Sequence, residues 1–495
     1  MSVRRLTATP NLFVAGILLI QTITHLFWLT ISAHSGQVAI PYMMNRGLTL
    51  FGSLLEQHAP ATSYIAALAQ RLLPFEPVDT VRLLNTGLVL LISVLIYVTA
   101  RRLTSGSALA GGAALLTWFL WEPVFGNVMF YFNTVMGFFI LVALGVWLAL
   151  HERRPILAAL LTGLLLGAAT LGKQHAWGEV ILFGAGLFLL PTTAARGRQL
   201  AVYALGVAVL PLLLIAVMIA QGTLDQYVYW NWTFNLSGLM PNELPTGDFL
   251  RKVLLSAAFV PAFVLLTARQ TERRAWIMTG LAGIGGSLPM LPRFGEVSAM
   301  GMLPFAAIMS GAVIGTWLRG HDLRRMFRPS TLRRLTTSQS VLLSLLVVTG
   351  FSVLWAVGAP YLKHEPIPAH DEFLPLVEHL HALSNPDDTL FVLPETDSTP
   401  QLHSLSGLLP PSTWIKGWFW YLIAPTEAGQ MSDQLLAEWS QTPPTYIVYF
   451  PVLAQTGLPG IEPLVAFMRD HYELVESVQD IRFHGDAEIY RFRHQ

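Results

Sequence analysis

The sequence contains no cysteine and comparatively few charged residues. Its 495 residues include zero cysteines, and only 12% are Asp, Glu, Lys or Arg, whereas roughly 25% of the residues of a soluble domain are charged. The absence of cysteine excludes disulfides, zinc–thiolate sites and thiol nucleophiles. The formal net charge is +0, and the sequence lacks the basic tracts of nucleic-acid-binding proteins. We therefore expect no nucleic acid among its partners.

Hydrophobic residues are abundant instead, at 53% of the chain with a mean hydropathy of +0.53. A helix that crosses a bilayer needs about 20 apolar residues, and we expect about eleven such helices in a polytopic α-helical membrane protein. The first apolar run is longer than the roughly 7–15 residues of a signal-peptide core, so we expect it to stay in the protein. The candidate spans are residues 12–31, 81–100, 107–121, 128–150, 156–171, 176–190, 201–220, 249–267, 275–290, 297–318 and 341–358.

Arginine residues gather in every second connection between these spans, which predicts the orientation of the chain. Cytoplasmic loops of membrane proteins carry an excess of Lys and Arg. We therefore expect a multi-pass protein of the inner cell membrane with a cytoplasmic N-terminus. The first loop, residues 32–80, and everything after the last span then lie outside the cytoplasm. The arginine pairs are Arg4 and Arg5, Arg101 and Arg102, Arg153 and Arg154, Arg196 and Arg198, and Arg273 and Arg274, and a larger group occupies residues 319–334.

The composition changes after the last candidate span, with Pro366 and Pro368 near the junction. Residues 1–360 form the predicted transmembrane domain and residues 361–495 a soluble extracytoplasmic α/β domain. Helical patterns at 371–383, 433–440 and 461–471 alternate with strand-like runs at 389–393, 445–450, 472–475 and 487–492. This part contains no glycine-rich phosphate loop and no nucleophile elbow. We expect it to support acceptor or partner binding.

The first outer loop carries the residues with the clearest chemical potential. Glu56 precedes His58 and Pro60 at the entrance to an amphipathic run, and a carboxylate there can accept a proton from a hydroxyl or an amine. The alternative is a charge that only stabilises a helix N-terminus. His34 and His58 are further proton carriers in the same loop. Glu56, His58 and Glu122 could hold a divalent metal ion only if the fold brought them together, and no cofactor is otherwise expected.

Other outer turns supply candidate ligands for a substrate. Glu122 follows an aromatic helix end, where it is either a solvated charge or an acid–base group. Lys173 and Gln174 form a short turn between two apolar helices; the lysine can extend to the interface or bind a phosphate. Arg293 either pairs with Glu296, three residues later, or binds a phosphate.

The order of these segments resembles the GT-C superfamily of glycosyltransferases, which use lipid-linked sugars and include protein O-mannosyltransferases and the aminoarabinose transferases of lipid A. The resemblance covers essentially the whole chain. It implies sugar transfer from a polyprenyl-phosphate-linked donor to a lipid, glycan or protein acceptor outside the cytoplasm. Residues 42–47 (YMMNRG) resemble a family helix that ends at a glycine, here Gly47. The other similar segments are residues 56–64 (EQHAPATSY), 82–85 (RLLN), 173–174 (KQ), 292–294 (PRF) and 303–305 (LPF).

The sequence departs from the family pattern at three positions. His34 and Ser35 stand where family members usually carry acidic residues in the first loop, and Asn133 stands where they carry a second aspartate. By this resemblance Lys173, Gln174, Asn133 and Arg293 are expected to contact the substrate. Glu56 is the first candidate for the base, ahead of His34, His58 and Glu122.

Two other functions fit the sequence less well. A diverged protein that binds lipid-linked sugars without transferring them agrees with the replaced acids. A transporter or flippase would show paired half-helices broken by Gly or Pro in two repeated halves, and the sequence shows no such repeat.

Overall fold

The structure is a computed structural model. It describes residues 3–23, 25–26, 35–122, 130–190, 195–236, 273–290, 300–320, 373–396, 399–415, 425–454, 458, 460–481 and 484–493.

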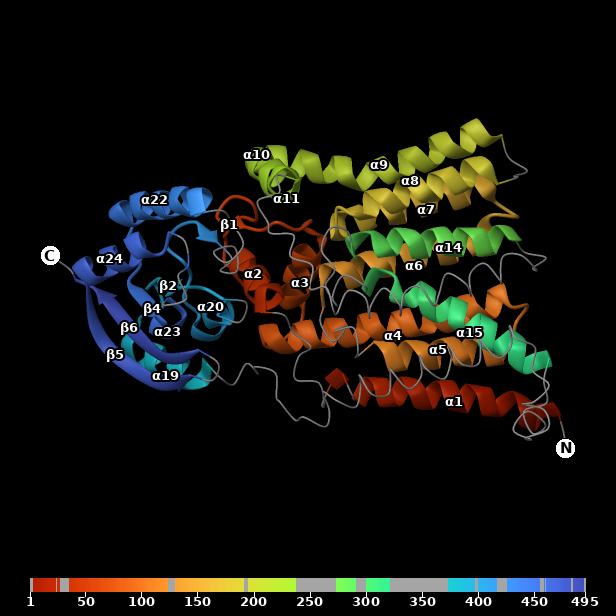
Figure 1. Ribbon diagram of the computed structural model, residues 1–495, viewed down its shortest axis with the longest axis horizontal. Helices are drawn as coiled ribbons and strands as arrows, with labels where there is room; N and C mark the ends of the chain where they lie inside the picture. Colours follow the sequence, from red (N-terminus) through yellow and green to blue (C-terminus); the bar gives the residue numbers. More distant parts are fainter. Residues whose placement is uncertain are drawn as a thin grey trace.

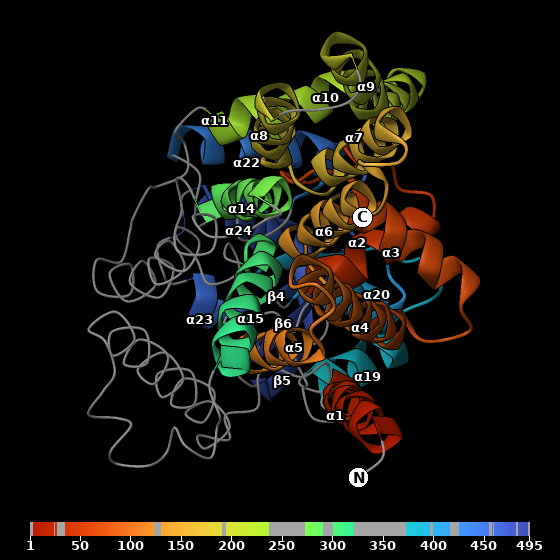
Figure 2. The same ribbon diagram turned by 90° about the vertical axis from the view of Figure 1, so that its right-hand side faces the viewer.

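A bundle of apolar helices forms the larger part of the molecule. Its helices run along one common direction, the long axis of Figure 1, and Figure 2 shows them end on. The described helices of the bundle are α1 (Val3–Ile23), α4 (Pro77–Leu103), α5 (Ala108–Trp121), α6 (Phe132–Leu150), α7 (Pro155–Gly172), α8 (Ala176–Leu189), α9 (Arg196–Gln221), α14 (Arg273–Ser287) and α15 (Leu303–Gly320).

Each of these helices coincides with a predicted span. Within the described residues, α4, α6, α7 and α9 are long and apolar enough to cross a membrane, and α1, α5, α8 and α15 contain shorter apolar stretches. The chain is therefore a polytopic helical membrane protein, as its composition predicts. The predicted spans 249–267 and 341–358 lie outside the described residues, so the total of eleven stays a prediction.

Helix α9 shows how the bundle separates lipid-facing from packed surfaces. Leu205, Leu212 and Ile219 are about 60% exposed, as side chains that meet lipid rather than water should be. The opposite face packs closely on α7, because a Cβ atom on Gly163 would collide with the carbonyl of Tyr203 and one on Gly167 would lie 2.5 Å from the carbonyl oxygen of Val207. Two glycines four residues apart are a common contact between membrane helices.

The first loop folds into two short helices and a strand at one end of the bundle. Helix α2 (Ser35–Asn45) ends before Gly47, whose φ of +103° places it in the left-handed region, which confirms the predicted helix end. Strand β1 (Leu54–Leu55) and helix α3 (Ala61–Leu72) follow. Beyond α9, helix α10 (Leu224–Val228), the π-helix η3 (Tyr229–Thr233) and α11 (Phe234–Leu236) cover the same end.

The C-terminal residues form an α/β unit around a four-stranded sheet with strand order β2-β4-β6-β5. The parallel pair β2 (Leu390–Leu393) and β4 (Tyr446–Tyr449) is fully buried, and the antiparallel pair β5 (Tyr472–Ile481) and β6 (Gly485–Phe492) completes the sheet. All four strands were predicted. The helices of this unit are α19 (Leu374–Leu383), α20 (Gln401–Ser406), α22 (Pro425–Gln441), α23 (Pro451–Ala454) and α24 (Glu462–His471).

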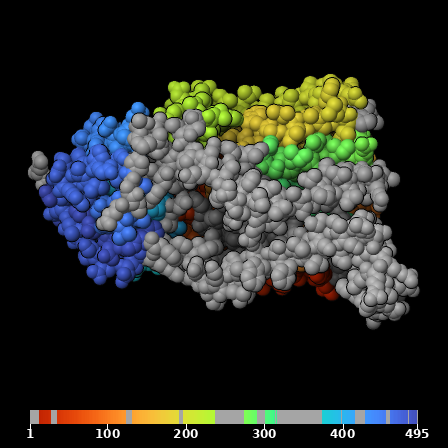
Figure 3. Space-filling model, in the orientation of Figure 1, coloured from red at the N-terminus to blue at the C-terminus, as the bar shows by residue number. Residues whose placement is uncertain are grey.

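The α/β unit docks on the first loop, at the end of the bundle far from the N-terminus (Figures 1 and 3). Strand β1 of the loop pairs in parallel with β3 (Trp414–Ile415), and the Trp414 amide donates to the carbonyl oxygen of Ser53 at 2.8 Å. One hydrophobic cluster also joins Met43 of α2, Met218 of α9 and Leu435 of α22. The first loop and the C-terminal unit thus share one side of the molecule.

Candidate functional site

A buried carboxylate–imidazole pair lies in the segment between β1 and α3. The side chain of Glu56 is fully buried, and its Oε1 lies 2.6 Å from the Nδ1 of His58 and 3.2 Å from the His58 backbone nitrogen. A carboxylate only accepts hydrogen bonds, so Nδ1 carries the proton and donates it. Such charge-assisted bonds are short and strong. The arrangement fixes the tautomer of His58 and the orientation of Glu56.

The His58 ring is held in place by the start of α6. It stacks on the ring of Phe132, with centroids 4.0 Å apart and planes 12° from parallel, and Tyr131 meets it edge-on at 6.1 Å. Asn133, the next residue of α6, is buried. The structure therefore brings the first turn of α6, which carries Asn133, next to the Glu56–His58 pair.

The backbone carbonyl of Gln57 joins two more segments to this pair. Its oxygen accepts a hydrogen bond from the side-chain amide of Asn235 at 3.0 Å and one from Gln174 at 3.4 Å. The Gln174 amide also donates to the carbonyl of Asn231 at 3.3 Å. The predicted residues Glu56, His58 and Gln174 are therefore neighbours. Asn231 and Asn235, each the first residue of an Asn-X-Ser/Thr sequence (NWT and NLS), are parts of the same packed region.

The turn between α7 and α8 places a lysine at this junction. Lys173 caps the C-terminus of α7 and is 9% exposed, and the backbone of residues 173–178 forms a tight turn that starts α8. The lysine thus sits beside an anion-attracting helix N-terminus. One turn into α8, the fully buried Glu179 packs against Gly285 of α14, where a Cβ atom would collide with its carboxylate.

Glu122 belongs to a second polar cluster, which crosses α1, α4 and α5. Its Oε1 lies 2.7 Å from the Nε2 of His25, and its Oε2 accepts from the side-chain amide of Gln21 at 2.8 Å. Ser93 of α4 donates to Gln21 at 2.7 Å. All four side chains are buried. The structure therefore pairs Glu122 with His25 rather than with Glu56 or His58. These contacts indicate a structural role for Glu122, because they hold α1 against α4 and α5.

Two predicted site residues, His34 and Arg293, lie outside the described residues. Among the residues that the structure does describe, no group of three or more His, Asp or Glu side chains could hold a metal ion. Glu56, His58 and Glu122 in particular are not gathered in one group.

The C-terminal unit contributes a buried polar cluster that sequence reasoning missed. Glu395 follows β2 and is 3% exposed; its Oε1 accepts the indole N–H of Trp414 at 2.7 Å and lies 3.5 Å from the Nε2 of His403. Trp414 also pairs with Leu54, two residues before Glu56. The one feature of the sequence that could have indicated this cluster is an acid, Glu395, at the carboxyl end of a buried strand.

Comparison with known proteins identifies the fold. No protein-family model and no curated protein matches the sequence. The structure is similar to that of ArnT from Cupriavidus metallidurans, solved with undecaprenyl phosphate bound, with a TM-score of 0.63 and 15% identity over 98% of each chain. It is also similar to the oligosaccharyltransferase of Archaeoglobus fulgidus, with a TM-score of 0.54 and 10% identity over 93% of this chain and 72% of that one.

A third similar structure is the arabinofuranosyltransferase AftD from Mycobacteria, with a TM-score of 0.56 and 14% identity. The match covers all of this chain but only 40% of AftD. The chain therefore has the GT-C fold, and the predicted resemblance is confirmed at the level of the fold.

Proposed function

We propose that the protein is a membrane glycosyltransferase that moves a sugar from a polyprenyl-phosphate-linked donor to an acceptor outside the cytoplasm. The observation that carries the proposal is the junction of Glu56, His58, Gln174 and Asn235 around the Gln57 carbonyl. The chain shares its fold over 98% of its length with a protein solved with undecaprenyl phosphate. The junction connects the buried Glu56, as the base, to the turn that carries Lys173.

The donor phosphate is assigned to the turn at the start of α8. A leaving group that becomes a lipid phosphate needs positive charge where its negative charge develops. Lys173 supplies a cation, and the N-terminus of the 14-residue helix α8 adds the positive end of its dipole. Arg293 stays a second candidate for this role from the sequence. Gln174 and Asn133 are assigned to sugar or acceptor positioning.

The role of general base is assigned to Glu56. A hydroxyl or amine of the acceptor attacks the anomeric carbon of the sugar, the bond from that carbon to the phosphate oxygen breaks, and the polyprenyl phosphate leaves with the electron pair. The proton lost by the acceptor passes to the carboxylate of Glu56. His58 is a positioning residue, because its Nδ1–H holds Oε1 of Glu56 at 2.6 Å.

The proposed orientation places this junction outside the cytoplasm. Arg102, Arg273 and Arg274 line a cavity of about 330 Å³ with His151 and Glu152 at the opposite end of the bundle. Several arginine-bearing connections thus share one end of the molecule, as an excess of positive charge on the cytoplasmic side requires. The first loop and the α/β unit then lie outside together.

The proposal is tested with the purified full-length protein in lipid nanodiscs. Transfer from polyprenyl-phosphate-linked sugars to envelope lipids is measured together with the affinity for undecaprenyl phosphate. Lys173→Gln is expected to weaken undecaprenyl phosphate binding at least about tenfold, since hydrogen bonds to charged groups contribute about 1.5–3 kcal/mol. The matched control is Arg153→Gln, an exposed cation at the other end of the bundle.

Two results would contradict the proposal. Undecaprenyl phosphate binding that is equally strong in Lys173→Gln and Arg153→Gln would remove Lys173 from the donor site. Tight binding by the wild type without transfer from any polyprenyl-phosphate-linked sugar would identify a binding protein instead of an enzyme.

A further inference from the structure

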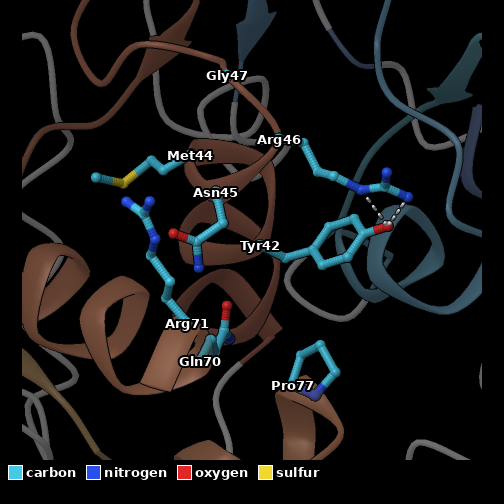
Figure 4. Close-up of a pocket in the computed structure, with 8 residues that line it drawn as sticks. All are labelled: Tyr42, Met44, Asn45, Arg46, Gly47, Gln70, Arg71 and Pro77. Atoms are coloured by element: carbon cyan, nitrogen blue, oxygen red, sulfur yellow. Dashed lines mark hydrogen bonds between the residues drawn. The ribbon is translucent and has the colours of Figure 1, made fainter. Parts of the chain in front are cut away.

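A cavity at the rim of the first loop lies outside the proposed reaction site. It has a volume of about 460 Å³ and lies where the ends of α2 and α3 meet the start of α4. The residues that line it are Tyr42, Met44, Asn45, Arg46, Gly47, Gln70, Arg71 and Pro77. Figure 4 shows Arg71 and Met44 on one side of this space and Tyr42 with Arg46 on the other.

Hydrogen bonds between α2 and α3 fix the walls of the cavity. The side-chain amide of Asn45 donates to the carbonyl of Ala67 at 2.9 Å, and that of Gln70 donates to the carbonyl of Val38 at 3.1 Å. The Arg46 guanidinium donates to the Tyr42 hydroxyl at 3.1 and 3.2 Å and lies over its ring. The cavity is therefore formed before any ligand arrives, which lowers the cost of ordering on binding.

The charge of the lining is positive. Arg46 and Arg71 contribute two guanidinium groups, and the lining residues include no acid. Two acids stand at the start of α4, where Asp79 lies 3.5 Å from Arg82 and Glu76 is exposed. Guanidinium groups present planar pairs of donors that match a phosphate. An anionic, oxygen-rich group fits this cavity.

An exposed apolar stripe runs beside the cavity. It consists of Leu68, Leu72 and Phe75, which are 59%, 70% and 52% exposed. Leu68 and Leu72 stand on the outer face of α3, whose opposite face is buried through Thr62, Ser63 and Ala66. Figure 2 shows α3 projecting sideways from the bundle. Helices with one apolar face and basic residues lie in the membrane interface.

From the positively charged cavity and the apolar stripe beside it, we infer that the cavity binds the phosphodiester headgroup of an anionic phospholipid. The phosphate binds to Arg71, next to the stripe, and Arg46 adds positive charge from the opposite side of the cavity. The acyl chains run along the stripe of Leu68, Leu72 and Phe75. The bound lipid would fix the first loop at the membrane surface. The inference does not depend on sugar transfer.

The test measures binding of dioctanoyl phosphatidylglycerol to the purified full-length protein in a neutral detergent, with inorganic phosphate as a second probe. The double variant Arg46→Gln/Arg71→Gln is expected to lose at least about tenfold in affinity for the lipid. The matched control, Arg153→Gln/Arg154→Gln, removes two exposed arginines at the other end of the bundle and should bind as the wild type does. Leu68→Ser/Leu72→Ser should weaken lipid binding and leave phosphate binding unchanged.

The variant Arg71→Lys guards against loss of folding, because it keeps the charge and should retain part of the affinity. Equal affinity of the Arg46→Gln/Arg71→Gln variant and its control would overturn the site. Phosphate binding as tight as that of the lipid, with no effect of the Leu68→Ser/Leu72→Ser change, would overturn the assignment to a membrane lipid and identify a site for free phosphate.

Discussion

The side-chain amide of Asn235 donates a hydrogen bond to the backbone carbonyl of Gln57 across 3.0 Å and 178 positions of sequence. The same amide donates to the carbonyls of Trp230 and Asn231 at 3.0 and 3.2 Å. One asparagine thus attaches the first loop to the segment that follows α9. It lies next to the peptide that connects Glu56 to His58.

Removing this donor should misplace the catalytic segment. Asn235→Asp keeps the shape of the side chain and puts a carboxylate oxygen against the three carbonyls. Because small displacements of catalytic groups can cost about 10²-fold in rate, we expect transfer to fall by about ten- to a hundredfold. Gln226→Glu, an exposed amide of α10, is the control. Equal transfer rates in the two variants would show that the attachment does not position Glu56.

The stacking of His58 on Phe132 is expected to matter for rate more than for stability. Phe132→Leu removes a stacked aromatic contact, and such contacts are worth about 0.5–1.5 kcal/mol. We expect turnover to fall about three- to tenfold with little change in the KM for the donor. Phe139→Leu, a partly buried residue of the same helix, is the control. A lowered melting temperature with unchanged turnover would assign Phe132 a structural role only.

The Glu122–His25 pair should behave as a structural ion pair. Breaking a buried pair from one side typically costs about 3–5 kcal/mol. His25→Leu should therefore lower the thermal stability strongly, and His25→Leu/Glu122→Leu should recover much of it. Glu122→Gln preserves the hydrogen-bonding shape and should keep transfer within about twofold of the wild type. A stable Glu122→Gln variant without transfer would instead make Glu122 the base.

The indole of Trp414 should contribute to docking of the α/β unit on the first loop. Trp414→Phe removes the hydrogen bond to the buried Glu395, and a buried group that loses its partner costs about 1–3 kcal/mol. Trp439→Phe is a matched control, because Trp439 is equally buried and its indole N–H has no hydrogen-bond partner among the described residues. The melting temperature of the full-length protein should fall further for Trp414→Phe. The same fall in both variants would mean that ring size, not the hydrogen bond, is what matters.

The sequence predicts the local features of this fold well. Apolar runs of span length mark the helices, and Gly47 marks the end of α2 because glycine readily adopts the positive φ found there. Short apolar runs such as LFVL and YIVY mark the buried strands of the α/β unit. The sequence also named Glu56, His58 and Gln174 as candidate site residues, and the structure places them next to one another. Their role in the reaction stays a prediction. These signals are local, and each needs only a short stretch of chain.

The contacts that build the site join distant segments and leave no such signal. No residue close to Glu122 in the sequence indicates that it pairs with His25, 97 positions earlier. The attachment of Asn235 to Gln57 uses a backbone carbonyl, which every residue has. Strands β1 and β3 have two residues each, which is too short for an alternating pattern. These features follow from how the helices pack in three dimensions.

The central claim is that Glu56 takes the proton of the acceptor. The most direct measurement compares transfer from a polyprenyl-phosphate-linked sugar by Glu56→Gln and by the control Glu76→Gln, an exposed acid in the same loop. Because general-base catalysis contributes about 10²–10⁴-fold, the account predicts that Glu56→Gln loses at least about a hundredfold in turnover while it binds undecaprenyl phosphate within twofold of the wild type. Turnover in Glu56→Gln equal to that in Glu76→Gln would contradict the account.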